Sequence, residues 1–226
     1  MDQRDPRSAH VTFPVYFRDV GSVSASSVIR ATPEKSFVRV DELPGSATAA
    51  RKAASRAAHD GLLIPVRRGL YYRGRRTRYG LTPPRTEDVV REVLGTRGVG
   101  PAGYSAARAL SLTSQIPPVL HVATLRTVEP IAGVKQHARK NLARVDLNAT
   151  EIALLEVLRA PEVFAEAGWD ALTAMVREAV AEGRVRLDAL TEAVPGEYNR
   201  AVRDNFASLT GVLKTSSDMG DTHAVA

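Results

Sequence analysis

Small, basic and hydroxyl side chains follow a clear helical pattern in residues 46–59. Six alanines fall on one side of a helix over this segment, and the long basic or hydroxyl side chains fall on the other. At about 100° per residue, the polar side chains cover an arc of roughly 140°. The pattern predicts a helix over residues 46–59 with Ser46 as its N-cap. Asp60 and Gly61 are typical of a helix end.

The segments on either side of this helix predict two further helices and a hairpin. The two helices are expected over residues 24–31 and 39–43, and a turn follows over residues 44–46. Two β-prone runs come after the long helix, over residues 62–66 and 70–73. Between these runs, Gly69 can adopt the positive φ that a tight hairpin needs. Helices followed by a hairpin with a basic tip are typical of a winged helix-turn-helix domain.

Beyond residue 85 the pattern predicts a second, mixed domain. Helices are expected over residues 86–94 and 105–110, and strands over residues 119–125 and 131–138. From Thr150 onward the spacing is helical, with segments over residues 151–158, 169–181, 187–194 and 197–213. The apolar side chains of the first two of these segments are assigned to the core: Ile152, Leu154, Leu155, Leu158, Leu172, Met175, Val176 and Val180.

These elements give an α+β fold class, with an N-terminal winged helix-turn-helix domain and a C-terminal mixed α/β domain that ends in a helical cluster. The expected divisions are a flexible N-terminus over 1–20, the DNA-binding domain over 21–78, the α+β domain over 86–214 and a disordered tail over 215–226. Residues 74–85 are rich in Arg, Gly and Pro and are expected to form the linker.

Composition narrows the class of protein. The chain has 226 residues, 44% of them hydrophobic, and no cysteine, which excludes disulfides and thiolate metal sites. The polar N-terminus has no apolar segment typical of a signal peptide. No apolar run approaches the roughly 18 residues that a membrane helix needs. The expectation is a soluble cytoplasmic protein with no membrane partner.

Positive charge is concentrated in the first part of the chain. Residues 1–80 hold 15 Lys and Arg against 7 Asp and Glu, whereas residues 81–226 hold 16 against 18. This asymmetry coincides with the predicted helix and hairpin, as expected for a domain that binds phosphates. The alternative interpretation is an ordinary solvated helix beside an ordinary hairpin.

The residues expected to contact double-stranded DNA come from this helix and hairpin. They are Ser46, Thr48, Arg51, Lys52, Ser55, Arg56, Arg67, Arg68 and Arg73. The helix is expected to enter the major groove, with Arg51 and Lys52 among the residues nearest the bases or flanking phosphates. Arg56, Arg67 and Arg68 are expected at phosphates or the minor groove. Tyr71 is expected to pack the hairpin onto the helices.

Candidate catalytic and cofactor patterns are weak. Residues 98–103 match G-x-G-x-x-G, but the expected helix before them is the wrong context for a dinucleotide site, so an interhelical loop is predicted. His121 and His137 could face each other across two strands, although core or surface positions are favoured. Ser105 lacks the second glycine of a nucleophile elbow and is expected to cap a helix. We therefore predict no enzyme activity, cofactor or metal.

Two segments resemble a known family. They are Gly-Leu-Leu-Ile-Pro-Val-Arg-Arg-Gly-Leu-Tyr over 61–71 and Gly-Tyr-Ser-Ala-Ala-Arg-Ala-Leu-Ser-Leu-Thr-Ser-Gln-Ile-Pro over 103–117. The chain resembles the AbiEi-like antitoxins of type IV toxin–antitoxin (abortive infection) systems over roughly residues 25–160. The match includes Arg68, Gly69, Tyr71, Ser105, Ala106, Leu110, Leu112, Gln115 and Pro117. Beyond about residue 160 the resemblance is only in helical character.

The resemblance implies a repressor that binds inverted repeats in its own promoter. It also implies a C-terminal domain that contributes to neutralising a nucleotidyltransferase-like toxin. Two other classes stay open: a stand-alone winged-helix regulator whose second domain senses a ligand, and an enzyme acting on nucleic acid. A ligand-dependent melting temperature would favour the first, and metal-dependent turnover of DNA or nucleotides would favour the second.

Overall fold

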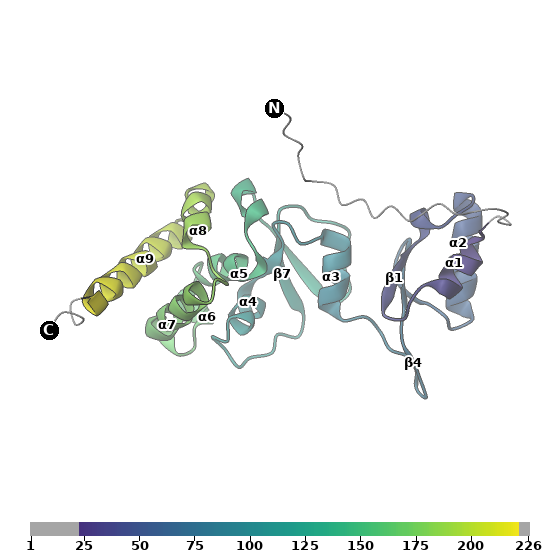
Figure 1. Cartoon of the computed structure of the whole chain (residues 1–226), viewed down its shortest axis with the longest axis horizontal. Helices are drawn as coiled ribbons and strands as arrows, with labels where there is room; N and C mark the ends of the chain where they lie inside the picture. The colour runs from purple at the N-terminus through teal and green to yellow at the C-terminus, as the bar shows by residue number, and fades with distance from the viewer. Residues whose placement is uncertain (1–22, 222–226) are drawn as a thin grey trace, which may run out of the picture. The chain divides into compact units, whose positions relative to one another are not determined.

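The computed structural model of the chain describes residues 23–221, with side chains described as far as residue 215. The chain divides into two compact units at Pro83 and Pro84 (Figure 1). The expected flexible N-terminus, residues 1–20, lies outside the described residues. Within the described part, no helix is both long and apolar enough to cross a membrane.

The first unit combines two helices with a small sheet. Its elements are α1 (Ala25–Ala31), β1 (Ser36–Arg39), the 3₁₀ helix η1 (Val40–Glu42), α2 (Ala47–His59), β2 (Ile64–Arg67), β3 (Leu70–Arg73), β4 (Arg76–Thr77) and β5 (Gly80–Leu81). The antiparallel sheet has the strand order β1-β3-β2. Its buried core includes Ile29, Val38, Leu43, Ala54 and Leu63.

Two predictions for this unit were wrong. Residues 39–43 form the end of β1 and the short η1 rather than an α-helix, because β1 pairs with β3 along its whole length and buries Val38. A five-residue helical pattern is too short to outweigh such pairing. The expected linker over residues 74–85 contains a second hairpin, in which β4 pairs with β5.

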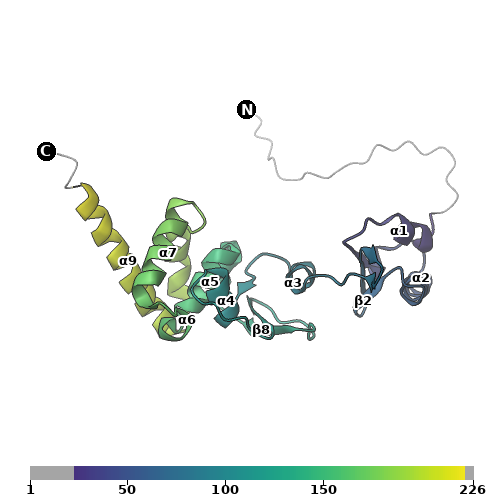
Figure 2. The ribbon, with the colours of Figure 1, turned by 90° about the horizontal axis from the view of Figure 1, so that it is seen from below.

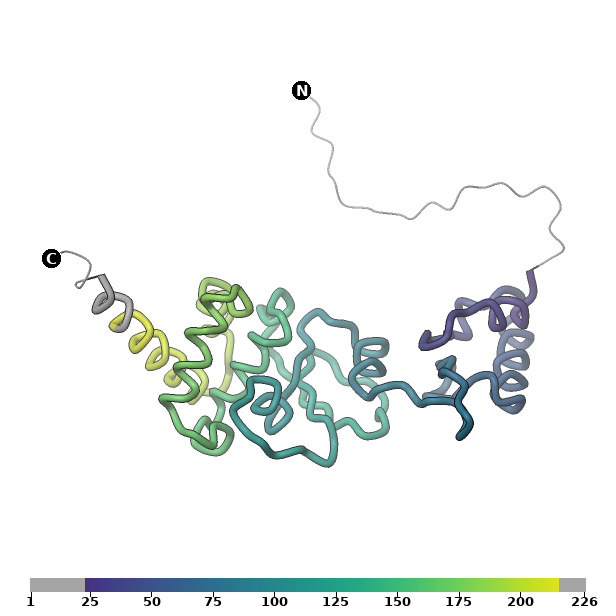
Figure 3. The backbone as a smooth tube through the Cα atoms, turned by 60° about the horizontal axis from the view of Figure 1, so that its bottom comes forward, coloured from purple at the N-terminus to yellow at the C-terminus, as the bar shows by residue number. Residues whose placement is uncertain are grey.

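The second unit places a three-stranded sheet beside a group of helices. Its elements are α3 (Thr86–Leu94), β6 (Gly100–Pro101), α4 (Gly103–Ala109), β7 (Leu120–Thr124), β8 (Val134–Ala138), η2 (Leu142–Asp146), α5 (Ala149–Val157), α6 (Pro161–Phe164), α7 (Gly168–Ala181), α8 (Leu187–Ala193), η3 (Val194–Gly196) and α9 (Arg200–Asp221). In the sheet, β7 pairs with β6 antiparallel and with β8 parallel. Figure 3 shows the helices after β8 gathered toward the C-terminal end.

Helix α5 is the centre of the second unit. Every residue from Glu151 to Leu158 is buried, as expected for a helix surrounded by other elements. It contacts α4 and β6, and Figure 2 shows it close beside α4. The predicted core is confirmed: six of the eight assigned side chains are buried, and Met175 and Val180 pack against them partly buried.

The G-x-G-x-x-G segment has a structural role in this unit. Its middle glycine, Gly100, lies in β6, where an added Cβ would come within 2.7 Å of the Ile152 side chain on α5. Glycine therefore allows the strand and the central helix to pack closely. The predicted interhelical loop is wrong here, because Gly100 and Pro101 pair with β7.

Two further expectations need correction. Ser105 does not cap α4, which begins at Gly103; its hydroxyl accepts a hydrogen bond from the His121 backbone N–H at 2.9 Å. The predicted disordered tail over 215–226 is wrong in its first part, because α9 continues to Asp221. The remaining residues, 222–226, lie outside the described part.

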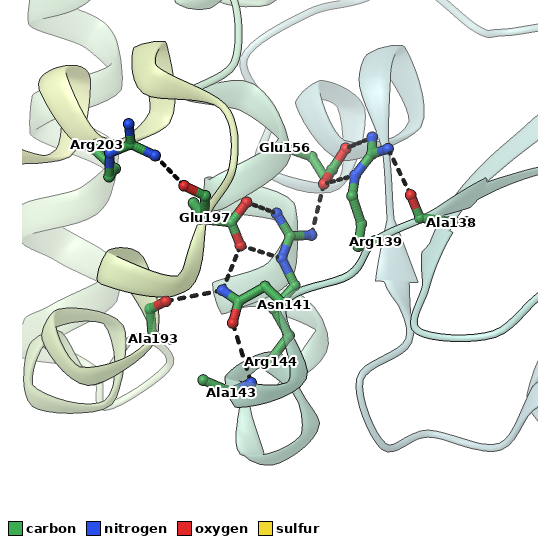
Figure 4. Close-up of polar contacts among 9 residues, drawn as sticks. All are labelled: Ala138, Arg139, Asn141, Ala143, Arg144, Glu156, Ala193, Glu197 and Arg203. Carbon is green, nitrogen blue, oxygen red and sulfur yellow. Dashed lines mark hydrogen bonds and ion pairs between the residues drawn. The ribbon is translucent and has the colours of Figure 1, made fainter.

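A buried group of charged side chains connects distant parts of the second unit. Arg144 donates to both carboxylate oxygens of Glu197, at 2.6 and 2.9 Å, and to Glu156 at 2.7 Å (Figure 4). Arg139 donates to both oxygens of Glu156, and Asn141 donates to Glu197 at 2.7 Å. Two cations thus balance two anions in the interior, which is the condition for burying such groups.

The hydrogen bonds keep this ion cluster ionised. Burial alone lowers the pKa of Arg144, but hydrogen bonds to Glu197 and the charge of Glu156 outweigh it and raise the pKa above its ordinary value. Burial alone raises the pKa of Glu156, but Arg139 and Arg144 hold it below its ordinary value. The sequence offered no local signal for the cluster, because its members lie up to 58 residues apart.

Candidate nucleic-acid interface

Helix α2 packs against the first unit through alanines. Ala50 and Ala54 are buried, Ala54 with no exposed surface, while Ala53, Ala57 and Ala58 are half-buried against the same core. Because alanine has no atoms beyond Cβ, α2 lies close against α1 and η1. Five of the six alanines therefore face the interior as predicted. The sixth, Ala49, is exposed near the start of the helix.

The opposite face of α2 consists of exposed polar side chains. They are Thr48, Arg51, Lys52, Ser55, Arg56 and His59. Within residues 23–215, Arg51, Lys52 and Arg56 make no side-chain hydrogen bond or ion pair with another protein group. Their charges are therefore available to an external anion, and the phosphates of DNA are such a ligand.

Ser46 begins this helix as predicted. Its hydroxyl accepts a hydrogen bond from the Ala49 backbone N–H at 3.2 Å. This bond satisfies one of the N–H groups that a helix start leaves without a partner. Ser46 therefore stabilises the end of α2 while its side chain stays at the exposed surface.

The two basic residues at the turn of the β2–β3 hairpin differ in exposure. Arg68 is exposed in the turn, whereas Arg67 is half-buried at the end of β2. Gly69 has φ +77°, the conformation that the turn requires. Its carbonyl accepts a hydrogen bond from the Val40 N–H at 2.9 Å, which fastens the turn to η1. Tyr71 packs against the core of the unit, as predicted.

Arg73 has an internal partner and does not belong to the exposed basic surface. Its Nη1 donates to the carbonyl of Ile29 at 2.9 Å and also to the carbonyls of Arg30 and Thr32. These groups lie at the C-terminal end of α1, where carbonyls lack partners within the helix and attract a cation. The geometry counts against the expected DNA contact, so we leave Arg73 out of the candidate interface.

The second unit contains two arrangements that are candidates for other chemistry. His121 and His137 do face each other across β7 and β8, with Nδ1 and Nε2 3.3 Å apart. Desolvation lowers the pKa of both rings, and neighbouring positive charges add to the effect. Among the side chains that the structure describes, no group of three or more His, Asp or Glu could hold a metal ion.

The other arrangement is a cavity of about 1040 Å³ formed wholly within the second unit. Apolar side chains from α3 and the sheet line it, including Val90, Leu120 and Val122. Arg91, Arg97 and Arg108 contribute positive charge at its walls. Arg91 pairs with Asp88 and Arg97 with Asp146. The volume is close to the upper end of the range of small-molecule pockets, about 1,000 Å³.

Comparisons with known proteins add little to this description. No family model matches the chain, and no curated protein matches it. Among solved structures, the chain is similar to the crystal structure of the RV2827C protein from Mycobacterium tuberculosis, with 18% sequence identity and a TM-score of 0.44. The likeness covers 84% of this chain and 79% of that one. A likeness at this level assigns neither a family nor a function.

Proposed function

We propose that this protein binds double-stranded DNA through α2, acting as the recognition helix of a winged helix-turn-helix domain. The observation that carries the proposal is the face of α2 that bears Arg51, Lys52 and Arg56. These cations are exposed and have no partner within residues 23–215, while the reverse face of the helix is closely packed. A rigid helix with unpaired cations on one side is suited to the major groove.

The hairpin supplies the second part of the proposed interface. With α2 in the major groove, Thr48, Arg51, Lys52 and Ser55 are the side chains assigned to base edges and flanking phosphates. Arg56 and the hairpin residues Arg67 and Arg68 are assigned to phosphates or the adjacent minor groove. Phosphate contacts fix the register of a protein on the duplex, and base contacts supply the specificity.

The biological role that we propose is repression of the protein's own operon. The resemblance to AbiEi-like antitoxins supports this role. It assigns DNA binding to the first unit, which extends to Pro83 rather than to the expected residue 78, and a separate role to the second unit. It further supports binding to inverted repeats in the promoter and neutralisation of a nucleotidyltransferase-like toxin in the cytoplasm. The second domain is the part proposed to act on the toxin.

The test is fluorescence anisotropy of the full chain with its own upstream promoter DNA and with scrambled DNA, at about 150 mM salt, where non-specific binding is micromolar or weaker. Arg51→Ala should cost about 1–3 kcal/mol if Arg51 contacts a guanine, a loss of about 5- to 150-fold in affinity. Arg68→Ala should weaken binding to both DNAs alike and lower the salt dependence by about one unit.

A matched control is Lys214→Ala, which removes one exposed cation from α9 in the second unit. Its binding to the promoter should equal that of the wild type. If Arg51→Ala also binds like the wild type, the assignment of α2 to the major groove is wrong. Equal and weak binding of the wild type to both DNAs would contradict the repressor proposal.

The cavity in the second unit favours one alternative function, a stand-alone regulator that senses a small molecule. The lining of the cavity carries three arginines against the acids Glu87 and Asp146, so its net charge is positive and suits an organic anion. The test is thermal unfolding of the full chain with a panel of small carboxylates and nucleotides. A saturable rise in melting temperature that Arg108→Ala abolishes would support this alternative, and no rise with any compound would count against it.

A further inference from the structure

A second, smaller hairpin follows the sheet of the first unit. It consists of β4 and β5, with Arg78 and Tyr79 between them at the tip. Figure 1 shows this β4–β5 hairpin as a narrow projection from the unit. Tyr79 is 84% exposed, and the guanidinium carbon of Arg78 lies 4.6 Å from the centre of its ring.

Hydrogen bonds that involve two threonines, Thr77 and Thr82, stabilise the hairpin. The Thr77 hydroxyl donates to the Gly80 carbonyl at 2.8 Å and accepts from the Tyr79 N–H at 3.2 Å. The Thr82 hydroxyl accepts from the Arg75 N–H at 3.0 Å, and the Thr82 N–H donates to the Arg75 carbonyl at 2.9 Å. A two-stranded hairpin alone is marginal in water, so these bonds help to order a segment that has little core of its own.

The hairpin is also fastened to the end of α2. Arg76 Nη2 donates to the Gly61 carbonyl at 3.0 Å, and Gly61 lies two residues beyond the last residue of α2. At the base, an added Cβ on Gly74 would lie 2.2 Å from the Thr82 carbonyl, so the two chain segments meet without room for a side chain. The tip is therefore positioned with respect to α2 within one folded unit.

All charged side chains of the hairpin are positive. Residues 74–82 contain Arg75, Arg76 and Arg78 and no acid. Within the described part of the chain, Arg75 and Arg78 form no ion pair, so their charges are unbalanced by protein groups. A cation over an aromatic ring has a restricted orientation. The hairpin thus presents the Arg78 guanidinium, held over the Tyr79 ring, at the end of a narrow projection.

We propose that the β4–β5 hairpin is a second DNA contact, which inserts Arg78 into the minor groove beside the major groove that α2 occupies. The proposal rests on the proposed function of α2. The minor groove is about 6 Å wide, and at A·T tracts it narrows and its negative potential attracts arginine. Tyr79 supports the guanidinium at the groove entrance, and Arg75 faces the adjoining phosphates. The preferred ligand is duplex DNA with an A·T-rich flank.

The experiment uses the full chain and promoter duplexes in which one flank of the binding site is A·T-rich or G·C-rich. Hydroxyl-radical footprinting reports the minor groove, and protection of guanine N7 from methylation reports the major groove. Arg78→Ala should remove the minor-groove protection on the flank, leave the guanine protection intact and weaken binding about tenfold. It should also abolish the preference for the A·T-rich flank. Tyr79→Ala should show a smaller loss of the same kind.

The outcomes separate this proposal from the function of α2. If Arg51→Ala weakens promoter binding but Arg78→Ala leaves affinity and both footprints unchanged, the hairpin contact is wrong and the α2 proposal stands. If Arg78→Ala weakens binding to both flanks equally, as loss of a phosphate contact would, minor-groove insertion is wrong. If the wild type binds no DNA, both proposals fail. Because Arg78 and Tyr79 are exposed, melting temperature serves to show that the variants stay folded.

Discussion

The buried ion cluster around Arg144 allows a quantitative prediction for the stability of the second unit. Arg144 is 1% exposed and donates three hydrogen bonds to the carboxylates of Glu156 and Glu197. Arg144→Met retains much of the side-chain volume but removes the cation. Glu156 keeps Arg139, whereas Glu197 keeps only the neutral Asn141 among its side-chain partners in Figure 4.

The expected cost follows from the charge that the substitution leaves behind. Removing one partner of a buried ion pair costs about 3–5 kcal/mol, because the other charge stays in the interior without compensation. Three charge-assisted hydrogen bonds at about 1.5 kcal/mol each give a similar sum. For a unit of this size, about 4 kcal/mol corresponds to a fall of roughly 12 °C in melting temperature.

Trp169 provides the assay. It is the single tryptophan of the chain and packs against the core of the second unit from α7, so its fluorescence reports the unfolding of that unit. The matched control is Arg200→Ala, which breaks an ion pair with Asp204 whose side chains are 84% and 63% exposed. Such a pair contributes at most about 1 kcal/mol. If Arg144→Met costs no more than Arg200→Ala, the cluster does not stabilise the unit as argued.

The remaining predictions concern core packing and pH. Ala54→Leu should destabilise the first unit by about 1–3 kcal/mol through overpacking, whereas Leu at the exposed Ala49 should change stability by at most about 0.5 kcal/mol; equal effects in chemical denaturation would contradict the packing of α2. The pKa values of His121 and His137 are lowered on folding, so the unfolded chain takes up protons first and the stability of the second unit should begin to fall as pH drops below 6.5. The pKa of Glu156 is also lowered, so its contribution should be complete above its ordinary value of 4.5 and lost as pH falls through the depressed pKa. Replacing both histidines by Gln should abolish the first decline in Trp169 fluorescence melts and leave the second.

Local sequence patterns predicted the structure correctly where the conformation depends on residues close together in the chain. The two-faced composition of residues 46–59 predicted α2 and its buried alanines, and Gly69 marked the turn of the β2–β3 hairpin. Residues 39–43 show where such patterns fail. Their partner strand, β3, lies some 30 residues further along the chain, and no short window of sequence contains that pairing.

In the candidate interface too, some side-chain positions follow from local sequence and others only from the folded structure. Arg51 and Arg73 are both arginines in a basic part of the chain, and both were predicted to contact DNA. Arg51 lies on the exposed face of a helix, a position that periodicity alone assigns. Arg73 reaches carbonyls more than 40 residues away, at the end of α1. The residues around Arg73 in the sequence therefore contain none of these partners.

Helix periodicity, turn residues and the distribution of charge were thus enough to predict the basic helix, the first hairpin and the apolar side chains of the core helices, because these depend on residues close in sequence. Folding added the fastened β4–β5 hairpin and the buried ion cluster of Arg144, and it decided that His121 and His137 lie in contact, which the sequence had left as one of several possibilities. Each of these requires groups that are distant in sequence to approach within hydrogen-bonding distance. Their energies arise from burial and from charges brought together, and both exist only once the chain has folded.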